Sequence, residues 1–395
     1  MLDFLLDWLN LLVRWAHFVF GVSWIGASFY FVWLDLSLRK RETMNPGVYG
    51  TSWLVHGGGF YHVEKYTVAP EKLPEDLHWF IWEAYLTWVT GFALLILQYY
   101  FNATSYLIDP EVMDLDPREA IAISVASLAT GWFIYDGLCR SPIGRNTAIL
   151  GAAVFVEICL GAWLFSHVFS GRAALIHVGA LVGTMMAANV FMVIIPNQRK
   201  MTAALMEGRA PDPRLGQIGK QRSTHNNYLT LPVLLMMVSG HYPMLYSHPH
   251  TWLVVAFILV IGAMVRHFIN RADAGDAFPT YSWALLAAAL ALVGALFMTR
   301  PEERPKVAVP VPTKSEVLAI LDTHCAMCHS PHPTHESFDV PPGDVVLVTI
   351  ADLRRFADRV EDQAVRGDAM PLGNETHMTD AERAQLGAWI EAKAQ

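Results

Sequence analysis

The chain has 395 residues, of which 53% are hydrophobic and only 16% are charged, against roughly 25% charged residues in ordinary soluble domains. This composition excludes a typical soluble protein, and the formal net charge of −8 argues against nucleic-acid binding. No signal-peptide pattern with a cleavage site precedes the first apolar segment, so we expect that segment to remain as a membrane anchor.

The first three quarters of the chain contain repeated apolar segments. A helix needs about 20 such residues to cross a bilayer. None of the segments alternates with period two, so a β-barrel is not expected. We therefore predict an all-α bundle of eight transmembrane helices, at approximately residues 11–35, 79–100, 119–138, 147–168, 172–195, 226–246, 251–270 and 280–298.

Basic residues are distributed unevenly over the loops between these segments. The loops after the first, third, fifth and seventh segments hold most of them, including Arg39, Lys40, Arg199 and Lys200, whereas the loop after the second is acidic. The positive-inside rule makes the basic loops cytoplasmic. An even number of spans then places both termini on the periplasmic side of a bacterial inner membrane.

The long loop between the first two predicted spans contains HGGGFYHVEKY, residues 56–66. Its glycines permit unusual backbone angles, and its tyrosines could stack on a flat ring. His56, His62 and Lys65 are candidate catalytic residues that could meet an anion, and Glu83, one turn into the second span, is a candidate proton acceptor. The alternatives are a membrane-surface loop anchored by aromatic side chains and a structural glutamate.

Histidines inside the predicted spans mark a second candidate site. With a rise of about 1.5 Å per residue, four of them fall in the outer third of the membrane: His17, His167, His177 and His241. They could hold a second redox centre, either a b-type haem or a metal ion. Each could also be a hydrogen-bonded interior residue, and spacing alone does not pair them.

After residue 298 the composition changes. Residues 299–312 are rich in proline and form a predicted linker between the transmembrane domain, 1–298, and a soluble domain, 313–395. Thr313 and Thr379 are each followed three residues later by glutamate, a pattern that predicts a capped helix at each end of the tail.

The tail carries the sequence DTHCAMCHSP, residues 322–331. Its C-x-x-C-H motif is typical of covalent haem c attachment, with Cys325 and Cys328 as thioether ligands of the porphyrin and His329 as iron ligand. Met370, in the loop AMPLGN, is the predicted sixth ligand. The tail then resembles a small class I cytochrome c.

Other interpretations of these residues stay open. The C-x-x-C-H motif could be half of a zinc site, and Met370 could fill a hydrophobic core. His377 and Met378 are the rival sixth ligands, and we expect His324, His332 and His335 to be exposed loop residues.

Two segments carry a family resemblance. These are GGGFYHVEKY and LPEDLHWFIWEAYLTWVTGF, residues 73–92; together with the predicted spans and the C-x-x-C-H tail they resemble the bacterial membrane-bound urate oxidases, or urate hydroxylases, over essentially the whole chain. The resemblance implies oxidation of urate to 5-hydroxyisourate in purine degradation. It also implies that electrons leave through the haem to a soluble cytochrome c or a terminal oxidase, without peroxide. It brings no assigned catalytic residue.

The electron count favours a further cofactor. Urate oxidation releases two electrons and one haem accepts one, so either a radical persists or a second redox centre exists. The rival function is a non-catalytic electron-transfer subunit that relays electrons from quinol or from a partner dehydrogenase. A transporter with a redox tail is disfavoured, because the spans show no clear inverted repeat.

Overall fold

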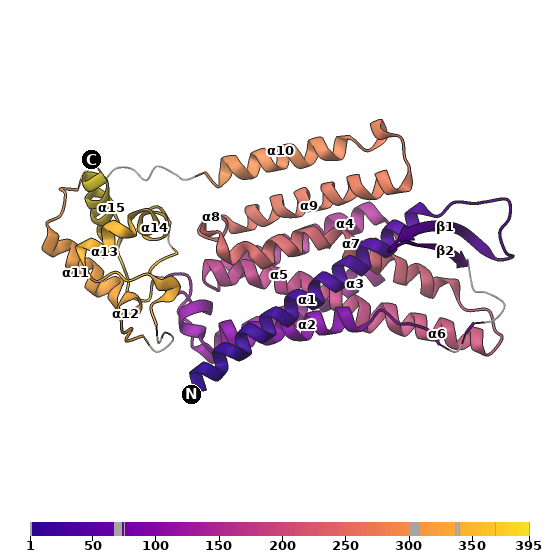
Figure 1. Cartoon of the computed structure of the whole chain (residues 1–395), viewed down its shortest axis with the longest axis horizontal. Helices are drawn as coiled ribbons and strands as arrows, with labels where there is room; N and C mark the ends of the chain where they lie inside the picture. The colour runs from indigo at the N-terminus through magenta and orange to yellow at the C-terminus, as the bar shows by residue number, and fades with distance from the viewer. Residues whose placement is uncertain are drawn as a thin grey trace.

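The computed structural model describes residues 2–66, 73–74, 76–300, 309–335, 338, 340–367 and 369–394. Within these residues the chain forms an elongated bundle of helices with a small helical tail at one end (Figure 1).

The bundle contains the following elements, in chain order: α1 (Leu2–Ser37), β1 (Val48–His56), β2 (Gly59–Tyr66), α2 (Trp82–Leu95), η1 (Ile96–Tyr100), η2 (Ala103–Leu107), α3 (Pro117–Arg140), η3 (Pro142–Arg145), α4 (Thr147–Ser166), α5 (Gly171–Ala188), η4 (Asn189–Ile194), α6 (Ile195–Met206), α7 (Pro213–Val238), η5 (Ser239–His241), α8 (Pro243–Tyr246), α9 (Thr251–Ala274), η6 (Phe278–Thr280) and α10 (Trp283–Met298).

Local sequence explains where several helices begin. Asp116 caps α3 in a capping box with Glu119, Asn146 caps α4 and Asp212 caps α7 ahead of a proline. In each case a short polar side chain accepts a backbone N–H that the helix leaves unpaired. Helix α9 ends at Gly275, whose φ of 80° suits the residue after a helix.

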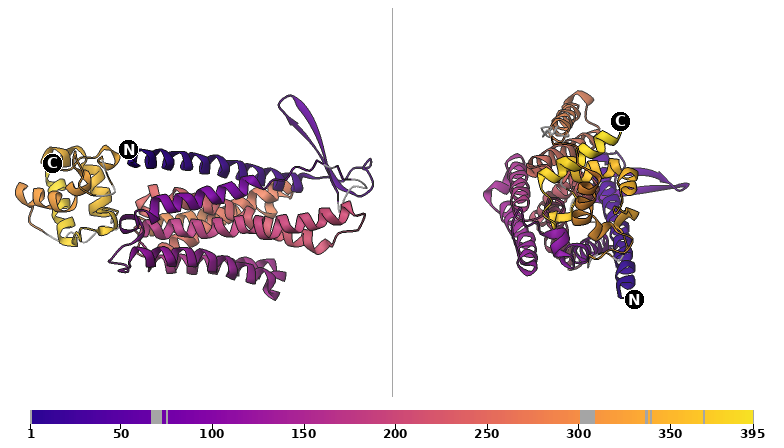
Figure 2. Two further views of the ribbon diagram at one scale, coloured as in Figure 1. Left: turned by 90° about the horizontal axis from the view of Figure 1, so that it is seen from below. Right: turned by 90° about the vertical axis from the view of Figure 1, so that its left-hand side faces the viewer.

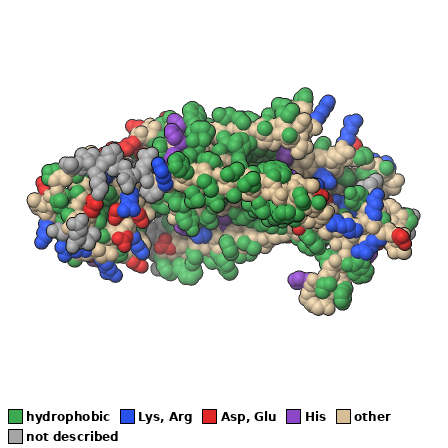
Figure 3. Space-filling view, turned by 90° about the horizontal axis from the view of Figure 1, so that it is seen from above, with side chains coloured by type: hydrophobic (Ala, Val, Ile, Leu, Met, Phe, Trp, Pro, Cys, Tyr) green, Lys and Arg blue, Asp and Glu red, His purple; other side chains and the backbone are tan. Residues whose placement is uncertain are grey.

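Among the described residues, five helices are long and apolar enough to cross a membrane: Phe4–Ser37, Pro117–Arg140, Thr147–Ser166, Gly171–Met206 and Thr251–Ala274. Apolar side chains also cover the middle of the bundle surface (Figure 3). On the helices of the bundle, Phe18 and Phe133 are 69% and 70% exposed. Each of the three other predicted spans overlaps a helix, namely α2 with η1, α7 and α10. The arrangement of eight spans remains a prediction.

The prediction of an all-α fold is wrong for the loop after α1. Strands β1 and β2 form an antiparallel hairpin that pairs His56 with Gly59. Between them Gly57 and Gly58 have φ of 59° and 81°, which are the angles of a tight hairpin turn that only glycine adopts easily. Most side chains around the turn are exposed, so the hairpin shows no alternation of apolar and polar residues.

The hairpin and the tail lie at opposite ends of the bundle (Figures 1 and 2). The tail contacts the bundle beside η2, where Asn374 donates its side-chain N–H to Glu111 Oε1 at 2.6 Å. Lys and Arg side chains gather at the end that carries the hairpin (Figure 3), and Arg199 and Lys200 are exposed on α6. The bundle is therefore polar at both ends and apolar between them.

The tail has its own hydrophobic core. Its elements are α11 (Lys314–His324), α12 (Ala326–His329), η7 (Pro342–Asp344), α13 (Ile350–Arg355), α14 (Ala357–Val360), η8 (Glu361–Arg366), η9 (Leu372–Asn374) and α15 (Asp380–Ala394). Val317, Leu321, Leu386 and Trp389 pack together at 0–2% exposure. The predicted capping boxes at Thr313 and Thr379 are both formed. Most of the predicted linker lies outside the described residues.

Candidate functional site

The C-x-x-C-H motif forms a single helical turn at the end of α11. Cys325 is the residue at which α11 ends and α12 begins. Its carbonyl oxygen accepts the N–H groups of Cys328 at 3.2 Å and His329 at 2.8 Å. Burial raises the pKa of Cys325 to about 12 and of Cys328 to about 11, so both side chains are neutral thiols. The turn presents two thiols and one imidazole from adjacent positions, as covalent haem attachment requires.

The imidazole of His329 is held in a defined orientation. Its Nδ1 lies 2.9 Å from the carbonyl oxygen of Val345 and donates a hydrogen bond to it. Burial lowers the pKa of His329, which favours the neutral ring. An imidazole fixed through Nδ1 offers Nε2 to a metal ion, the common arrangement of protein metal ligands. These residues therefore fit a haem iron.

Met370 lies in the second half of the tail and packs against the same hydrophobic cluster as Cys325. Its N–H donates to Gln363 O at 2.9 Å, and its carbonyl oxygen accepts from Arg383 at 2.7 Å. Its rival Met378 is only 3% exposed inside the tail core, and the other rival, His377, is exposed. The assignment of Met370 as sixth ligand remains a prediction.

Two of the tail histidines differ from expectation. His324 is 7% exposed, and its ring nitrogens contact Thr376 Oγ1 at 2.8 Å and Glu382 Oε1 at 3.2 Å. His335 is largely buried and contacts Glu375 at 2.9 Å. The expectation that both are exposed loop residues is wrong, because the tail folds these side chains against carboxylates that are distant in sequence. His332 is exposed, as predicted.

His177 lies fully buried in α5 and takes part in a chain of hydrogen bonds. Its Nδ1 donates to Ala173 O at 2.7 Å, and its Nε2 lies 2.7 Å from Ser124 Oγ. Ser124 in turn lies 2.7 Å from the hydroxyl of Tyr100. Both ring nitrogens thus have protein partners, which is how a structural interior histidine is satisfied.

The other three outer histidines lie in different settings. His17 contacts Thr87 O at 3.0 Å and Thr90 Oγ1 at 3.1 Å, and its ring lies against Gly91, where a Cβ would come within 2.8 Å. His167 is exposed and contacts Trp163 O at 2.7 Å, and His241 is exposed in η5. Among the described residues no group of three or more His, Cys, Asp or Glu side chains is placed to hold a metal ion. Whether any of the four ligates a haem stays a prediction.

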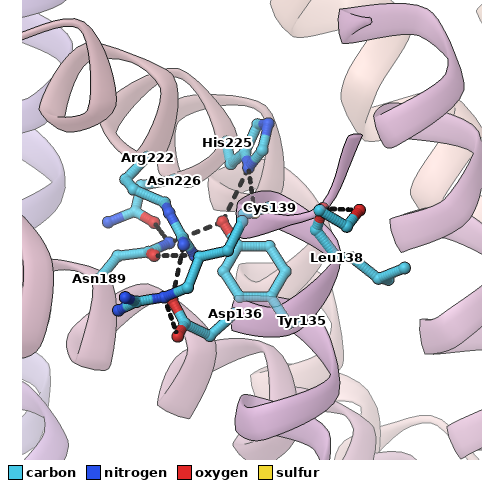
Figure 4. Close-up of polar contacts among 10 residues, drawn as sticks. Tyr135, Asp136, Leu138, Cys139, Asn189, Arg222, His225 and Asn226 are labelled. Carbon is cyan, nitrogen blue, oxygen red and sulfur yellow. Dashed lines mark hydrogen bonds and ion pairs between the residues drawn. The ribbon is translucent and has the colours of Figure 1, made fainter. Parts of the chain in front are cut away.

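A buried polar cluster joins α3, η4 and α7 (Figure 4). Arg222, only 2% exposed, donates to Asp136 Oδ1 at 2.6 Å and to Asn189 Oδ1 at 3.2 Å. Asn189 also donates to Tyr135 at 2.9 Å and to Asn226 at 2.8 Å. An ionic network that crosses helices in an apolar bundle fixes their relative positions. The Tyr135 hydroxyl extends the network to His225, whose Nδ1 lies 2.7 Å away.

Sequence reasoning missed this cluster. Arg222 falls in the loop between the predicted fifth and sixth spans, and Asp136 lies within the predicted third span. An aspartate inside an apolar segment is costly without a partner, and this is the signal that could have indicated a buried cation nearby.

The candidate catalytic residues of the segment 56–66 lie on the surface of the hairpin. His56, His62 and Lys65 are exposed. The ring of His62 lies against that of Trp53, tilted by 34° with the centroids 4.5 Å apart, and Lys65 forms an ion pair with Asp35 at 2.5 Å. Glu83 lies at the start of α2, partly buried, and its Oε2 has no hydrogen-bond partner in the part of the chain that the structure describes. Among the described residues these hairpin side chains are surface groups, and their catalytic role stays a prediction.

A cavity of about 220 Å³ lies where the bundle meets the tail. Ser105, Tyr106, Arg172 and Tyr246 line it from the bundle, and Ala369 and Leu372 line it from the tail loop that contains Met370. The side chains of Arg172 and Tyr246 are joined by a hydrogen bond of 3.1 Å. The cavity thus combines a cation, hydroxyl groups and aromatic rings next to the candidate haem residues.

By its fold the protein is mostly helical, with several helices of membrane-spanning length and a small tail that presents a C-x-x-C-H turn. Residues 3–299 match the family model described as urate oxidase N-terminal, so the chain belongs to the urate oxidase N-terminal family. Neither the curated proteins nor the solved structures gave a match.

Proposed function

We propose that this protein oxidises urate to 5-hydroxyisourate in a bacterial inner membrane, as a step of purine degradation. In this reaction urate and water give 5-hydroxyisourate, two protons and two electrons. The electrons reduce two equivalents of an oxidised c-type cytochrome, or pass to a terminal oxidase, without forming peroxide. One observation carries the proposal: a urate oxidase N-terminal match over residues 3–299 is joined, in one chain, to a C-x-x-C-H turn with an oriented His329.

The tail residues suit a covalent haem c. Cys325 and Cys328 would hold the porphyrin, and His329 and Met370 would ligate its iron. When bound there, the group would accept electrons from the urate reaction one at a time. The protein groups around it would do the rest: the Val345 carbonyl orients His329, and Arg383 holds the backbone of Met370.

The distribution of charge and apolar surface supports a membrane position with a periplasmic tail. The basic end of the bundle, with the hairpin, lies opposite the end that contacts the tail (Figures 1 and 3). The positive-inside rule makes the basic end cytoplasmic. Haem c is attached outside the bacterial cytoplasm. The charge distribution and the haem motif therefore both support a periplasmic tail.

A second redox centre remains part of the proposal, because two electrons must leave urate. His17, His167, His177 and His241 are the candidate ligands. In His17 and His167 the described hydrogen bonds of the ring involve only Nδ1, so Nε2 would be the ligating atom in both. Extraction of non-covalent haem, together with metal analysis of the purified active protein, tests this part. A preparation with one haem c and no other cofactor would contradict it.

The experiment that tests the function is anaerobic addition of urate to the purified, oxidised single chain. Reduction of the haem spectrum by urate, with 5-hydroxyisourate as product, is the expected result. The rival function, an electron-transfer subunit fed by quinol or a partner dehydrogenase, predicts no reduction by urate and rapid reduction by a quinol. Xanthine, which lacks the oxygen at C8, serves as the control substrate.

A further inference from the structure

We infer that the cavity between bundle and tail binds the oxopurine anion, with Arg172, Ser105 and Asp109 contacting the polar groups at its edge. This inference rests on the proposed function, since it locates the substrate of that reaction. The cavity lies at the end of the bundle opposite the hairpin, which carries the candidate catalytic residues His56, His62 and Lys65.

The size of the cavity suits a single purine. Pockets for drug-sized ligands occupy roughly 300–1,000 Å³, and this one occupies about 220 Å³. Tyr106 and Tyr246 supply aromatic side chains on its walls, which favour a flat ligand. Tyr246 is 6% exposed, so its ring is fixed by packing.

The charge of the cavity suits an anion. Arg172 forms no ion pair with any described residue, and its buried Nε has no hydrogen-bond partner. The guanidinium is positioned through its Nη2, which donates to the Tyr246 hydroxyl at 3.1 Å, and it lies 5.4 Å from the centre of that ring. Arg172 also stands at the second residue of α5, whose N-terminus carries partial positive charge.

The hydrogen-bonding groups match the edges of an oxopurine. Ser105 is only 1% exposed, yet its Oγ has no hydrogen-bond partner among the described residues. An unpaired hydroxyl in a buried position is costly, so its place on the cavity wall indicates a ligand that completes the bond. Asp109 lines the same cavity and would repel a simple anion. Urate carries both carbonyl acceptors and N–H donors, so it can face Arg172 and Ser105 with the first and Asp109 with the second.

The cavity also shares a wall with the candidate haem site. Ala369 and Leu372 flank Met370 in sequence and line the cavity from the tail. Cys325, Cys328, His329 and Met370 are not among its lining residues, so a ligand there does not compete with their predicted role. Substrate and electron acceptor would then occupy adjacent sites on the same side of the membrane.

The test is equilibrium dialysis of radiolabelled urate against the purified full chain, kept reduced with dithionite so that no turnover occurs. We expect Arg172→Gln to raise Kd for urate about 10- to 100-fold, through loss of a charge-assisted contact. Ser105→Ala should raise it about 3- to 10-fold and leave Tm unchanged, since no protein group loses a partner. Arg118→Gln, an exposed arginine at the start of α3, is the matched control and should not change Kd.

The outcomes separate this inference from the proposed function. If urate reduces the wild-type haem but both cavity variants bind urate like wild type, the cavity is not the site and the function stands. If wild-type protein neither binds urate nor is reduced by it, the function fails and the inference falls with it. If Arg172→Gln does not fold, Ser105→Ala decides, because removing its hydroxyl breaks no protein contact.

Discussion

Arg222 Nη2 lies 2.6 Å from Asp136 Oδ1, and this contact joins α7 to α3 with the guanidinium only 2% exposed. The same aspartate also contacts Arg140 at 2.6 Å, but the Arg140 side chain is 69% exposed. One carboxylate thus has a buried and an exposed arginine as partners, and the two should differ greatly in their effect on stability.

Asp136→Ala should destabilise the bundle by about 3–5 kcal/mol, because it leaves a buried guanidinium without its counter-ion. Arg140→Gln removes only an exposed partner and should cost less than about 1 kcal/mol. Thermal unfolding of both variants in detergent checks this. Equal losses of stability would mean that Arg222 is not buried in the membrane-embedded protein.

Met370→Ala should leave haem covalently attached and lower its reduction potential, since a thioether ligand stabilises ferrous iron. The weak charge-transfer band from iron–methionine ligation should disappear. Met378→Leu is the control: that side chain is 3% exposed in the tail core, and the substitution keeps its volume. An unchanged spectrum in Met370→Ala, with a changed one in Met378→Leu, would assign the sixth ligand to Met378 instead of Met370.

Glu382 should make the tail sensitive to acid. Hydrogen bonds from the Thr379 side chain and backbone, at the start of α15, lower the pKa of Glu382 to about 2. A carboxylate whose pKa is lowered in the folded state stabilises the fold at pH values above its usual pKa. This contribution is lost as the pH falls toward 2. Thr379→Val should weaken the cap by about 1 kcal/mol. It should also make the free energy of unfolding depend less steeply on pH below pH ~4.5.

The measurement for this prediction is the stability of the tail in the full chain, followed through the haem spectrum during denaturant titration at several pH values. Asp322→Asn, at an exposed position of α11, is the control and should keep the wild-type slope. A slope that Thr379→Val does not change would assign the acid sensitivity to another carboxylate.

The hairpin provides the next test, since the sequence predicted candidate catalytic residues there. His56→Ala and Lys65→Ala should keep kcat and KM within about twofold, because both side chains are exposed and Lys65 contributes only a surface ion pair. Glu83→Gln should behave in the same way if urate binds near the tail. A tenfold loss in Glu83→Gln with normal haem content would instead restore Glu83 as the proton acceptor.

The helices of the bundle and the capped helices of the tail could be predicted because their signals are local. Apolar length marks α4 and α9, and a threonine three residues before a glutamate marks α11. The hairpin strands lack the alternation that identifies a half-buried strand, although the Gly57–Gly58 pair between them is a local signal of a two-residue turn. The sequence also underestimated α7, whose first half is polar and includes the residues that meet Asp136 and Asn189.

The candidate site also has a part that could be predicted from local sequence and a part that could not. The C-x-x-C-H turn is contiguous in sequence, and its chemistry could be predicted from spacing. The cavity gathers Ser105, Arg172, Tyr246 and Leu372 from four separate elements or loops, and no spacing rule connects them. His324 was mispredicted for the same reason, because its partners Thr376 and Glu382 are more than 50 residues away.

The last prediction concerns the exit of electrons. A full chain with Cys325→Ala and Cys328→Ala lacks both attachment points for haem but keeps the two hydrophobic cores, one in the bundle and one in the tail. It should insert in the membrane and bind urate, since neither cysteine lines the cavity. It should not reduce added cytochrome c, because electrons from urate have lost their acceptor in the tail. A chain ending at Met298 should fail in the same assay and also bind urate more weakly, because it lacks the cavity wall formed by Ala369 and Leu372. Cytochrome c reduction, peroxide release and urate binding, measured on the same preparations, check these expectations. Sustained oxygen-dependent turnover with stoichiometric peroxide in the cysteine variant would show that the bundle is an oxidase by itself, with a dispensable tail.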